Sequence, residues 1–492
     1  MENFKIEVDA DGVALVTFDV PGRTMNTLTA KVVQEFPEVI TRIKTDPAIK
    51  GAVLTSGKPT GFCAGADLGE MGSGALTGGP DTRSEDDKLK AQFEGAFLLN
   101  KTFRAMETCG KPVACALNGL ALGGGLEIAL ATHYRVVADN PKIQLGLPEA
   151  KVGLLPGAGG TQRLPRLIGM QAAAGLILEG KPSSPAEALK LGFVDAVVPA
   201  DQVVAAAKAW ILEKGDPVAR WDKKDFRIPG GGPSTPGGAQ IFIMGNAMLR
   251  KQSYGNYPAQ LNIMKCFYEG LQVPIDAALR IESRYFVKTL ATPQAKAMIR
   301  SLFLSMQELG KGAARPEGFA PYKINKVAVL GAGMMGAGIA YVQALAGIET
   351  VLIDQSQEAA EQGKAYSANL LAKQVSRGKM DQAKADAILA LITPTTDYAQ
   401  VKGADLVVEA VFETREIKAE VTKKAEAQLA ETAVFGSNTS TLPITGLAEV
   451  SARPANFIGI HSSPPWTRWV WWRSSWVRRP ARRPWPRPST TS

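Results

Sequence analysis

Two glutamates in the first third of the chain lie beside glycine-rich turns and could perform acid–base chemistry on a carbonyl compound. Glu127 follows the glycine triplet 123–125, and Glu149 precedes the glycine-rich stretch GLLPGAGGTQRL. Two carboxyl groups beside one water molecule can remove a proton from that water and deliver a proton to carbon. Apolar surroundings raise the pKa of such carboxyl groups into the range that this chemistry requires.

Small residues around these glutamates could stabilise negative charge on the carbonyl oxygen. Three glycines let the backbone approach a ligand closely, and the apolar run after them predicts a buried helix with free N–H groups at its start. A second turn of small residues, FCAGADLGEM, could supply the N–H group of Ala66. Such N–H groups stabilise an enolate-like transition state. A glycine triplet alone can also serve helix packing, but the three segments together favour a site.

A third glycine-rich turn, about two hundred residues further on, is typical of dinucleotide binding. The apolar run 327–330 predicts a strand, and Gly331, Gly333 and Gly336 follow it at the start of a predicted helix. Glycines at this spacing let a pyrophosphate approach the N-terminus of the helix. Asp354 ends a second apolar run, where its carboxylate can bind a ribose 2′-OH and repel a 2′-phosphate. We therefore expect NAD as cofactor, in preference to NADP.

The elements that must position the two glutamates follow an alternating pattern. Short apolar runs typical of buried strands alternate with helical spacing, and they lie at 13–20, 51–55, 113–117 and 134–138. This alternation predicts an α/β domain over residues 1–200.

The rest of the chain divides at stretches rich in proline and glycine. We expect a Pro/Gly-rich and helical linker region over residues 201–321, because IPGGGPSTPGG is followed by apolar residues three and four positions apart. A new strand–turn–helix pattern predicts a Rossmann-type domain over residues 322–461.

The overall composition indicates a cytoplasmic protein with reduced thiols. The 492 residues are 45% hydrophobic and 21% charged, which is typical of soluble globular proteins with more than one core. We expect no membrane span, since no long uncharged apolar run occurs, and the N-terminus lacks the pattern of a secretory signal. The four cysteines lack metal-ligand spacing, so we expect no metal site.

Residues 462–492 differ in composition from the rest of the chain. They carry seven arginines but no lysine or acidic residue, so they account for seven of the nine net positive charges. Six of the eight tryptophans also lie there, among six prolines. We favour a shifted reading frame as the origin of this tail and expect it to be disordered. The alternative is a genuine Arg/Trp segment that binds nucleic acid or an anionic surface.

Residues 1 to about 200 resemble the enoyl-CoA hydratase/isomerase, or crotonase, family, on FCAGADL, NGLALGGGLE and GLPEAKVGLLPGAGGTQRLPRLIG. The resemblance implies a ββα-spiral fold and an oxyanion hole from the N–H groups of Ala66 and Gly124, which polarise the thioester carbonyl of a 2-enoyl-CoA. It makes Glu149 the principal acid/base at the α-carbon and lets Glu127 hold and activate water. The carbonyl of Ala64 would contact the adenine of CoA. Two glutamates favour hydration to a 3-hydroxyacyl-CoA over Δ3-Δ2 isomerisation, which stays an alternative.

Residues 322–461 resemble the NAD-binding domain of 3-hydroxyacyl-CoA dehydrogenases, on ADLVVEAVFE, FGSNTSTLPIT and FIGIH. The resemblance implies that Glu413 and Lys418 line the cofactor region and that Asn438 lies near the nicotinamide. It places Ser440 near the substrate hydroxyl and makes His461 the catalytic base. The other histidine of the chain, His133, matches no catalytic position, and we expect it to be structural.

The order of the two regions is similar to that of the multifunctional fatty-acid oxidation α-subunits. We therefore expect a β-oxidation enzyme that acts on acyl-CoA thioesters, with a thiolase subunit and a homo-oligomer as candidate partners. The family's continuation after His461, including an acidic partner for this histidine and a helical domain, is absent. The expectation is a C-terminally truncated chain with an impaired dehydrogenase half.

A rival from another class is a non-catalytic NAD- or RNA-binding protein that uses the Arg/Trp tail. The intact glutamate pair speaks against this rival, so we do not expect nucleic acid as a partner.

Overall fold

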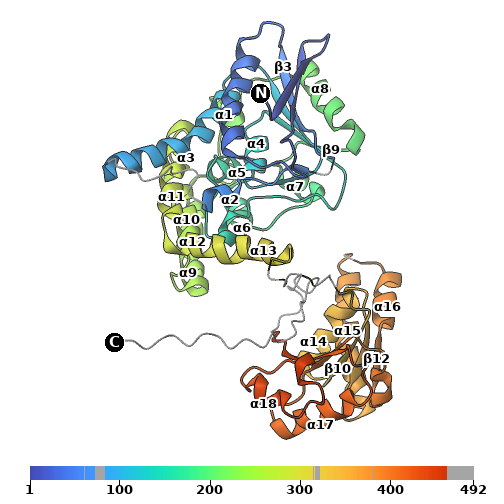
Figure 1. The fold of residues 1–492 in the computed structure, drawn as a ribbon. Coiled ribbons are helices and arrows are strands. Elements are labelled where there is room, and N and C mark those ends of the chain that lie inside the picture. The colour runs from blue at the N-terminus through green and yellow to red at the C-terminus, as the bar shows by residue number, and fades with distance from the viewer. Residues whose placement is uncertain are drawn as a thin grey trace. The chain divides into compact units, whose positions relative to one another are not determined.

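The chain folds into two compact units of mixed α/β structure, which confirms the predicted fold class (Figure 1). The first unit extends from Met1 to Lys311, and the second begins at Gly312. The computed structural model describes residues 1–59, 61–72, 84–313, 315, 318, 322–378 and 380–462. The predicted disorder of the Arg/Trp tail concerns residues that, apart from Ser462, lie outside the described part of the chain.

Two sheets form the centre of the first unit. The six strands of the larger sheet, in spatial order, are β1 (Phe4–Val8), β2 (Val13–Phe18), β3 (Gly51–Ser56), β5 (Val113–Leu117), β7 (Tyr134–Ala138) and β9 (Ala196–Val198). Only β1 and β2 pair antiparallel. Every residue of β3 and β5 is buried, as expected for parallel strands with both faces covered. The smaller parallel sheet contains β4 (Gly61–Cys63), β6 (Leu120–Leu122) and β8 (Leu145–Gly146).

Helices surround these sheets, and local sequence signals set their ends. They are α1 (Ala30–Thr45), α2 (Leu68–Gly72), α3 (Glu85–Glu107), α4 (Gly124–Leu130), η1 (Glu149–Val152), α5 (Gly160–Ile168), α6 (Met170–Glu179), α7 (Pro185–Leu191), η2 (Ala200–Gln202), α8 (Val203–Glu213) and η3 (Arg220–Asp222). The side chain of Thr29 caps α1 through the N–H group of Val32. Ser184 and Glu187 form a reciprocal capping box at the start of α7.

The helices that follow belong to the first unit, although the sequence predicted a linker region over 201–321. They are α9 (Pro236–Ser253), α10 (Pro258–Gly270), α11 (Ile275–Leu290), α12 (Pro293–Met298), the π-helix η4 (Ile299–Leu304) and α13 (Ser305–Gly310). α11 packs against α10 and α3, as Figure 1 also shows. Ile263 and Phe267 of α10 lie in the same hydrophobic core as the strands of the larger sheet. Apolar residues at helical spacing therefore bury these helices against the first unit.

The second unit is built on one six-stranded parallel sheet. Its strands, in spatial order, are β12 (Ile392–Thr395), β11 (Glu349–Ile353), β10 (Lys326–Leu330), β13 (Leu406–Glu409), β14 (Val434–Ser437) and β15 (Phe457–Gly459). The other elements are α14 (Met334–Leu345), α15 (Gln357–Ser376), α16 (Gln382–Ala390), η5 (Tyr398–Val401), α17 (Arg415–Glu426), α18 (Ile444–Ala448) and η6 (Pro454–Asn456).

The strand order of this sheet defines where a ligand can bind. The chain moves from β10 outward to β12 and then returns to the other side of β10 with β13. This is the doubly wound Rossmann order, in which dinucleotides bind at the carboxyl ends of the strands where the order reverses. The expected crevice therefore lies beyond Leu330 and Glu409.

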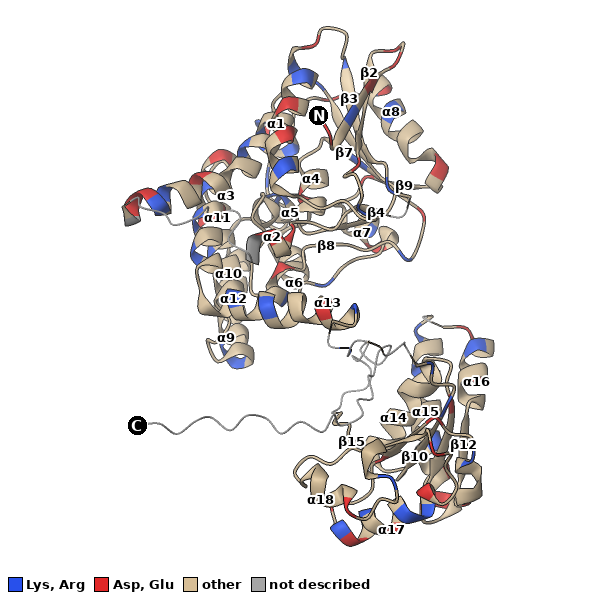
Figure 2. Cartoon of the chain, viewed as in Figure 1, with Lys and Arg blue, Asp and Glu red and all other residues tan. Residues whose placement is uncertain are grey.

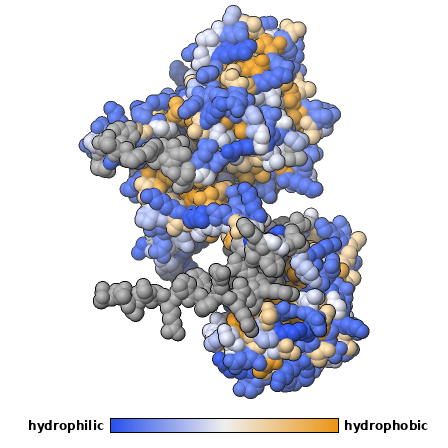
Figure 3. All heavy atoms as spheres, in the orientation of Figure 1, coloured by the Kyte–Doolittle hydropathy of each residue, from blue (hydrophilic) through white to orange (hydrophobic). Residues whose placement is uncertain are grey.

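The surface carries charges of both signs on both units (Figure 2). The face in Figure 3 is largely hydrophilic with scattered apolar residues. Among the helices of the described residues, none combines the length and apolar character needed to cross a bilayer.

The contact between α14 and the turn before it leads to a first prediction. A Cβ atom at Gly336 would lie 1.6 Å from the carbonyl oxygen of Gly331, whereas one at Gly333 would meet nothing within 4 Å. Gly336→Ala should therefore destabilise the second unit by about 1–3 kcal/mol, the usual cost of overpacking. Hydrogen exchange in β10 and α14, read by mass spectrometry, should become faster. Gly333→Ala is the matched control and should leave protection unchanged; equal protection in both variants would contradict the packing argument.

Candidate functional site

The glycine triplet at the start of α4 packs directly on the turn that follows β4. A Cβ atom at Gly125 would lie 2.2 Å from the carbonyl oxygen of Cys63. A Cβ atom at Gly65 would lie 3.3 Å from the backbone nitrogen of Gly124. Gly65 and Gly123 also have positive φ angles of 92° and 54°, which side chains disfavour. Glycine is therefore required for these two turns to meet.

Two N–H groups at these adjoining turns are available to a ligand. In the described part of the chain, the N–H groups of Ala66 and Gly124 donate no hydrogen bond. Ala64 and Ala66 are exposed, while Gly124 is buried at the first position of α4. The positive end of a helix dipole lies at that position. The structure thus places the residues predicted for an oxyanion hole side by side.

Glu127 is buried within α4, and its carboxylate is held by backbone donors. The side chain is 2% exposed. Its Oε1 atom accepts hydrogen bonds from the N–H groups of Ala158 at 2.8 Å and Gly160 at 2.7 Å. Burial raises the pKa of Glu127 well above its usual value, the charges of Glu149 and Glu282 add to this rise, and the two N–H groups oppose it.

Glu149 stands at the start of η1, on the other side of the glycine triplet. Its Oε1 atom would lie 2.9 Å from a Cβ atom at Gly123. Its Oε2 atom is buried and has no hydrogen-bond partner among the described residues. Burial raises the pKa of Glu149 to about 8, and the charge of Glu282 contributes. A carboxyl group that stays protonated at neutral pH, with one oxygen unpartnered, is suited to proton donation.

The two glutamates are coupled electrostatically. The charge of Glu149 raises the pKa of Glu127. Groups coupled in this way lose their protons as a pair. A third carboxylate, Glu282 of α11, also reaches this site and was not predicted. Glu282 lies three residues after Leu279 on the buried face of this helix, but helical spacing alone does not indicate what that face contacts.

The glycine turn of the second unit has the geometry of a dinucleotide site. Gly331 follows β10 with a φ of 94°, and α14 begins at Met334. The N–H group of Ala332 donates to Oδ2 of Asp354 at 2.6 Å, so the acid at the end of β11 lies beside the turn. Gly333 faces open space where a pyrophosphate would approach. Met334 is 68% exposed and offers apolar surface at the same place. These residues fit a bound dinucleotide.

A buried ion pair lies beneath the loop that follows β13. The Lys418 ammonium contacts Oε1 of Glu409 at 2.9 Å and Oε2 of Glu413 at 3.1 Å. Glu409 also accepts hydrogen bonds from the Ser437 hydroxyl at 2.7 Å and the Val411 N–H at 2.8 Å. Lys418 is buried, so it reaches the predicted cofactor region only through Glu413. Glu409 was not predicted, although a glutamate directly after three apolar strand residues signals a buried partner.

Glu413 holds the loop that carries the predicted substrate residues. Its Oε1 atom accepts hydrogen bonds from the Thr439 hydroxyl, the Ser440 N–H and the Thr441 N–H. Burial raises the pKa of Glu413, but these donors and Lys418 outweigh that effect and lower it to about 2. Glu413 is therefore ionised at any physiological pH.

Asn438, Ser440 and His461 come together at the carboxyl ends of β14 and β15. Oδ1 of Asn438 accepts hydrogen bonds from the N–H and hydroxyl groups of Ser462, each at 2.9 Å. Nδ1 of His461 lies 3.3 Å from the carbonyl oxygen of Thr439, and its ring is exposed. The three residues therefore lie on the side of the sheet where the dinucleotide crevice is expected.

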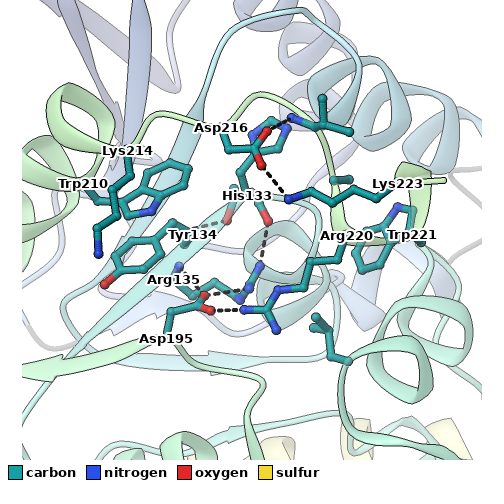
Figure 4. Close-up of a pocket in the computed structure, with 14 residues that line it drawn as sticks. His133, Tyr134, Arg135, Asp195, Trp210, Lys214, Asp216, Arg220, Trp221 and Lys223 are labelled. Carbon is teal, nitrogen blue, oxygen red and sulfur yellow. Dashed lines mark hydrogen bonds and ion pairs between the residues drawn. The ribbon is translucent and has the colours of Figure 1, made fainter. Parts of the chain in front are cut away.

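His133 lies apart from both sites, at a cavity of about 420 Å³ (Figure 4). Its Nδ1 atom accepts a hydrogen bond from the Val113 N–H at 3.0 Å, and Nε2 lies 3.1 Å from the carbonyl oxygen of Glu107. Burial lowers the pKa of His133, which keeps the ring neutral. Both ring nitrogens thus tie the backbone together, which is a structural role.

Most of the charged groups that line this cavity are paired with one another. Asp195 contacts Arg135 at 2.6 Å and Arg220 at 2.5 Å, and Asp216 contacts Lys223 at 2.6 Å (Figure 4). Within the described residues, no group of three or more His, Cys, Asp or Glu side chains is arranged to hold a metal ion.

Comparison with known families identifies both regions. Residues 9–216 match the family model for enoyl-CoA hydratase/isomerase. Residues 326–468 match the model for the NAD-binding domain of 3-hydroxyacyl-CoA dehydrogenase. The chain therefore carries a crotonase domain followed by a 3-hydroxyacyl-CoA dehydrogenase NAD-binding domain, as the sequence motifs indicated.

Curated relatives match most of the chain. The chain is homologous to the fatty acid oxidation complex subunit alpha of Shewanella halifaxensis, with 40% identity over 467 residues. The match covers 94% of this chain and 64% of the relative, and the Shewanella putrefaciens protein of the same name is 39% identical. The chain thus spans somewhat less than two thirds of the length of these relatives.

Solved structures match parts of the chain. An enoyl-CoA hydratase from Bacillus anthracis is 27% identical, with a TM-score of 0.37, and the match covers 63% of this chain and 96% of that one. An (S)-3-hydroxybutyryl-CoA dehydrogenase from Ralstonia eutropha is 36% identical, with a TM-score of 0.28, and the match covers 28% of this chain and 49% of that one.

The buried ion pair of the second unit leads to a second prediction. Lys418→Met would leave Glu409 as an uncompensated buried charge, so it should destabilise the second unit by about 3–5 kcal/mol. The double variant Lys418→Met/Glu409→Gln should recover part of this loss. Hydrogen exchange in β13 and β14 measures both effects. Lys424→Met, which breaks an exposed pair with Glu420 on the same helix, should change little. If hydrogen exchange in Lys418→Met were as slow as in the native chain, the result would contradict the structural role of the ion pair.

Proposed function

We propose that the first unit hydrates trans-2-enoyl-CoA thioesters to 3-hydroxyacyl-CoA in fatty-acid β-oxidation. The observation that carries this proposal is the buried pair of Glu127 and Glu149 beside the free N–H groups of Ala66 and Gly124. Acid–base groups and oxyanion donors at one place are what the addition of water to an enoyl thioester requires. The match to the hydratase/isomerase family supports the same reaction class.

The proposed reaction begins at the thioester carbonyl. The N–H groups of Ala66 and Gly124 donate to the carbonyl oxygen and stabilise the negative charge that develops there. Water held by Glu127 gives one proton to this carboxylate while its oxygen bonds to the β-carbon. Glu149 delivers its proton to the α-carbon. The proton now on Glu127 passes back to Glu149, so one molecule of water is added and the pair is restored.

The roles of the two glutamates follow from their surroundings. Glu127 accepts two backbone hydrogen bonds that favour its carboxylate form, the form that removes a proton from water, although burial and the charges of Glu149 and Glu282 raise its pKa overall. Glu149, with its pKa near 8 and an unpartnered Oε2, favours the acid form that donates a proton. The backbone carbonyl of the exposed residue Ala64 would contact the adenine of CoA.

Isomerisation of 3-enoyl-CoA is the second candidate function for this site. The matching family model covers both activities, and isomerisation needs only proton transfer between two carbons. Two carboxyl groups with different hydrogen-bond partners favour hydration, because water must be activated as well. Turnover of a 3-enoyl-CoA without hydration of the 2-enoyl isomer would support the isomerase instead.

We further propose that the second unit binds NAD in preference to NADP. Asp354 would accept a hydrogen bond from the ribose 2′-OH, while the N-terminus of α14 and Gly333 would accommodate the pyrophosphate. When bound, the cofactor would accept hydride from a 3-hydroxyacyl-CoA, and His461, Asn438 and Ser440 would face that substrate. Glu413 would hold the loop carrying Ser440 in place. A thiolase subunit and a homo-oligomer stay predicted partners, and impaired dehydrogenation stays a prediction.

The third prediction concerns the acid that protonates the α-carbon. Glu149→Gln should lower kcat for crotonyl-CoA hydration by about 10² or more, since the amide cannot donate a carboxyl proton. In the unaltered chain the acid form of Glu149 is present below its raised pKa, so activity should fall as pH rises through about 8. Loss of the enoyl-thioester ultraviolet absorbance measures both. Glu179→Gln, at an exposed glutamate of α6, is the control. Near-native turnover in Glu149→Gln would exclude the assigned role.

The fourth prediction concerns cofactor selection. Asp354→Asn keeps an oxygen that can accept from the Ala332 N–H, but it removes the charge that repels a 2′-phosphate. The variant should bind NADH almost as well as the native chain and bind NADPH more tightly. Calorimetric titration of the whole chain with each cofactor measures this change. Equal affinity of the native chain for both cofactors would refute the role of Asp354.

A further inference from the structure

A buried carboxylate outside the matched hydratase region contacts the loop that holds Glu127. Glu282 lies on α11, beyond residues 9–216 of the family match, and its side chain is fully buried. Its Oε1 atom accepts from the Gly159 N–H at 2.6 Å, and its Oε2 atom accepts from the Thr161 N–H at 2.9 Å and the Thr161 hydroxyl at 2.5 Å. Asn100 of α3 adds a further donor at 3.3 Å.

The two buried carboxylates divide the N–H groups of one loop between them. Glu127 binds the N–H groups of Ala158 and Gly160, and Glu282 binds those of Gly159 and Thr161. Four successive N–H groups therefore point alternately to two glutamates from different helices. Neither carboxylate can shift without disturbing the peptide units that the other one holds.

The backbone conformation of this loop requires glycine at positions 159 and 160. Gly159 has a φ of 102°, and a Cβ atom there would lie 1.6 Å from Nη1 of Arg163. A Cβ atom at Gly160 would lie 2.9 Å from Oε1 of Glu127. Arg163 in turn binds the carbonyl oxygen of Ala158 at 2.9 Å. The loop is thus bound from its N–H side by two carboxylates and from its carbonyl side by one guanidinium.

We propose that Glu282 is a positioning residue for the hydratase site: it fixes the loop 158–161 and thereby sets the place of the Glu127 carboxylate. The proposal rests on the function assigned to the first unit. Glu282 itself touches no substrate in this account. Displacement of a reacting group by about 1 Å can cost as much as 10²-fold in rate, so a shift of Glu127 should appear in kcat. The oxyanion donors lie on other turns, so substrate affinity should change little.

The first test needs no activity. Hydrogen exchange at single-residue resolution is measured on the whole chain with and without Glu282→Gln. The amide of the new side chain repels one of the N–H groups that Glu282 binds. If Glu282 fixes the loop, exchange should accelerate about tenfold or more at all four residues, including Ala158 and Gly160, which Glu282 does not contact. Acceleration confined to Gly159 and Thr161 would overturn the proposal.

The second test is kinetic. Glu282→Gln should lower kcat for crotonyl-CoA about ten- to hundredfold and change KM less than about threefold. Ser283→Ala is the matched control, because Ser283 is a buried neighbour on α11 that binds Asn100 but not the loop. It should retain kcat. A native kcat in Glu282→Gln would overturn the proposal. A fall in KM and kcat that Ser283→Ala reproduces would also overturn it.

A second variant decides the matter if Glu282→Gln does not fold. Thr161→Val removes the hydroxyl that donates to Glu282 and accepts from Nε2 of Gln162, at almost constant volume. It should lower kcat several-fold with KM unchanged and speed exchange at Gly160. An unaltered native chain that fails to hydrate crotonyl-CoA would refute the proposed function alone, because the exchange test of Glu282 does not depend on turnover.

Discussion

A carboxyl group buried away from water must find hydrogen-bond donors, and this constraint organises the first unit. Glu127 lies in a fully buried helix and receives its donors from a loop that begins 31 residues later in the chain. That loop can present consecutive N–H groups only because Gly159 and Gly160 leave room for them. The glycine triplet before Glu127 also provides a hydrogen-bond donor, because it leaves the N–H group of Gly124 free for a ligand. Glycine-rich turns therefore both allow the Glu127 carboxyl group to be buried and leave N–H donors available to a ligand.

In the second unit, buried charge and backbone N–H groups find different partners. There the glycine turn follows β10 at the point where the strand order reverses, and a Cβ atom at Gly333 would meet nothing within 4 Å, so an anionic ligand could take the part that Glu127 plays in the first unit. The charge that is buried, Glu409, is neutralised by Lys418 and by donors from neighbouring strands. Glu413 extends this network to the loop of Ser440. The network therefore lies at the carboxyl ends of β13 and β14, on the side of the sheet where a dinucleotide is expected.

Much of both sites could be predicted because their chemistry depends on local sequence. The glycine turns, Asp354 and the two glutamates proposed as catalytic stand in short segments whose backbone geometry follows from residue type. Glu282 could not be found in this way, because its partner Gly159 lies 123 residues away. Its position depends on how α11 packs against α3 and α10, and spacing within one helix does not reveal that. The same packing explains why the stretch predicted as a linker region is part of the first unit: its apolar faces had no assigned partner in the sequence.

We infer that the buried carboxyl pair of the first unit holds protons at neutral pH, one of them on Glu149. Infrared difference spectroscopy of the whole chain against Glu149→Gln tests this claim without substrate. We expect a carboxylic-acid C=O band at neutral pH that is missing from the variant and that disappears as pH rises through about 8. Identical spectra of the two proteins at neutral pH in this region would show that Glu149 is already ionised, and they would contradict the account.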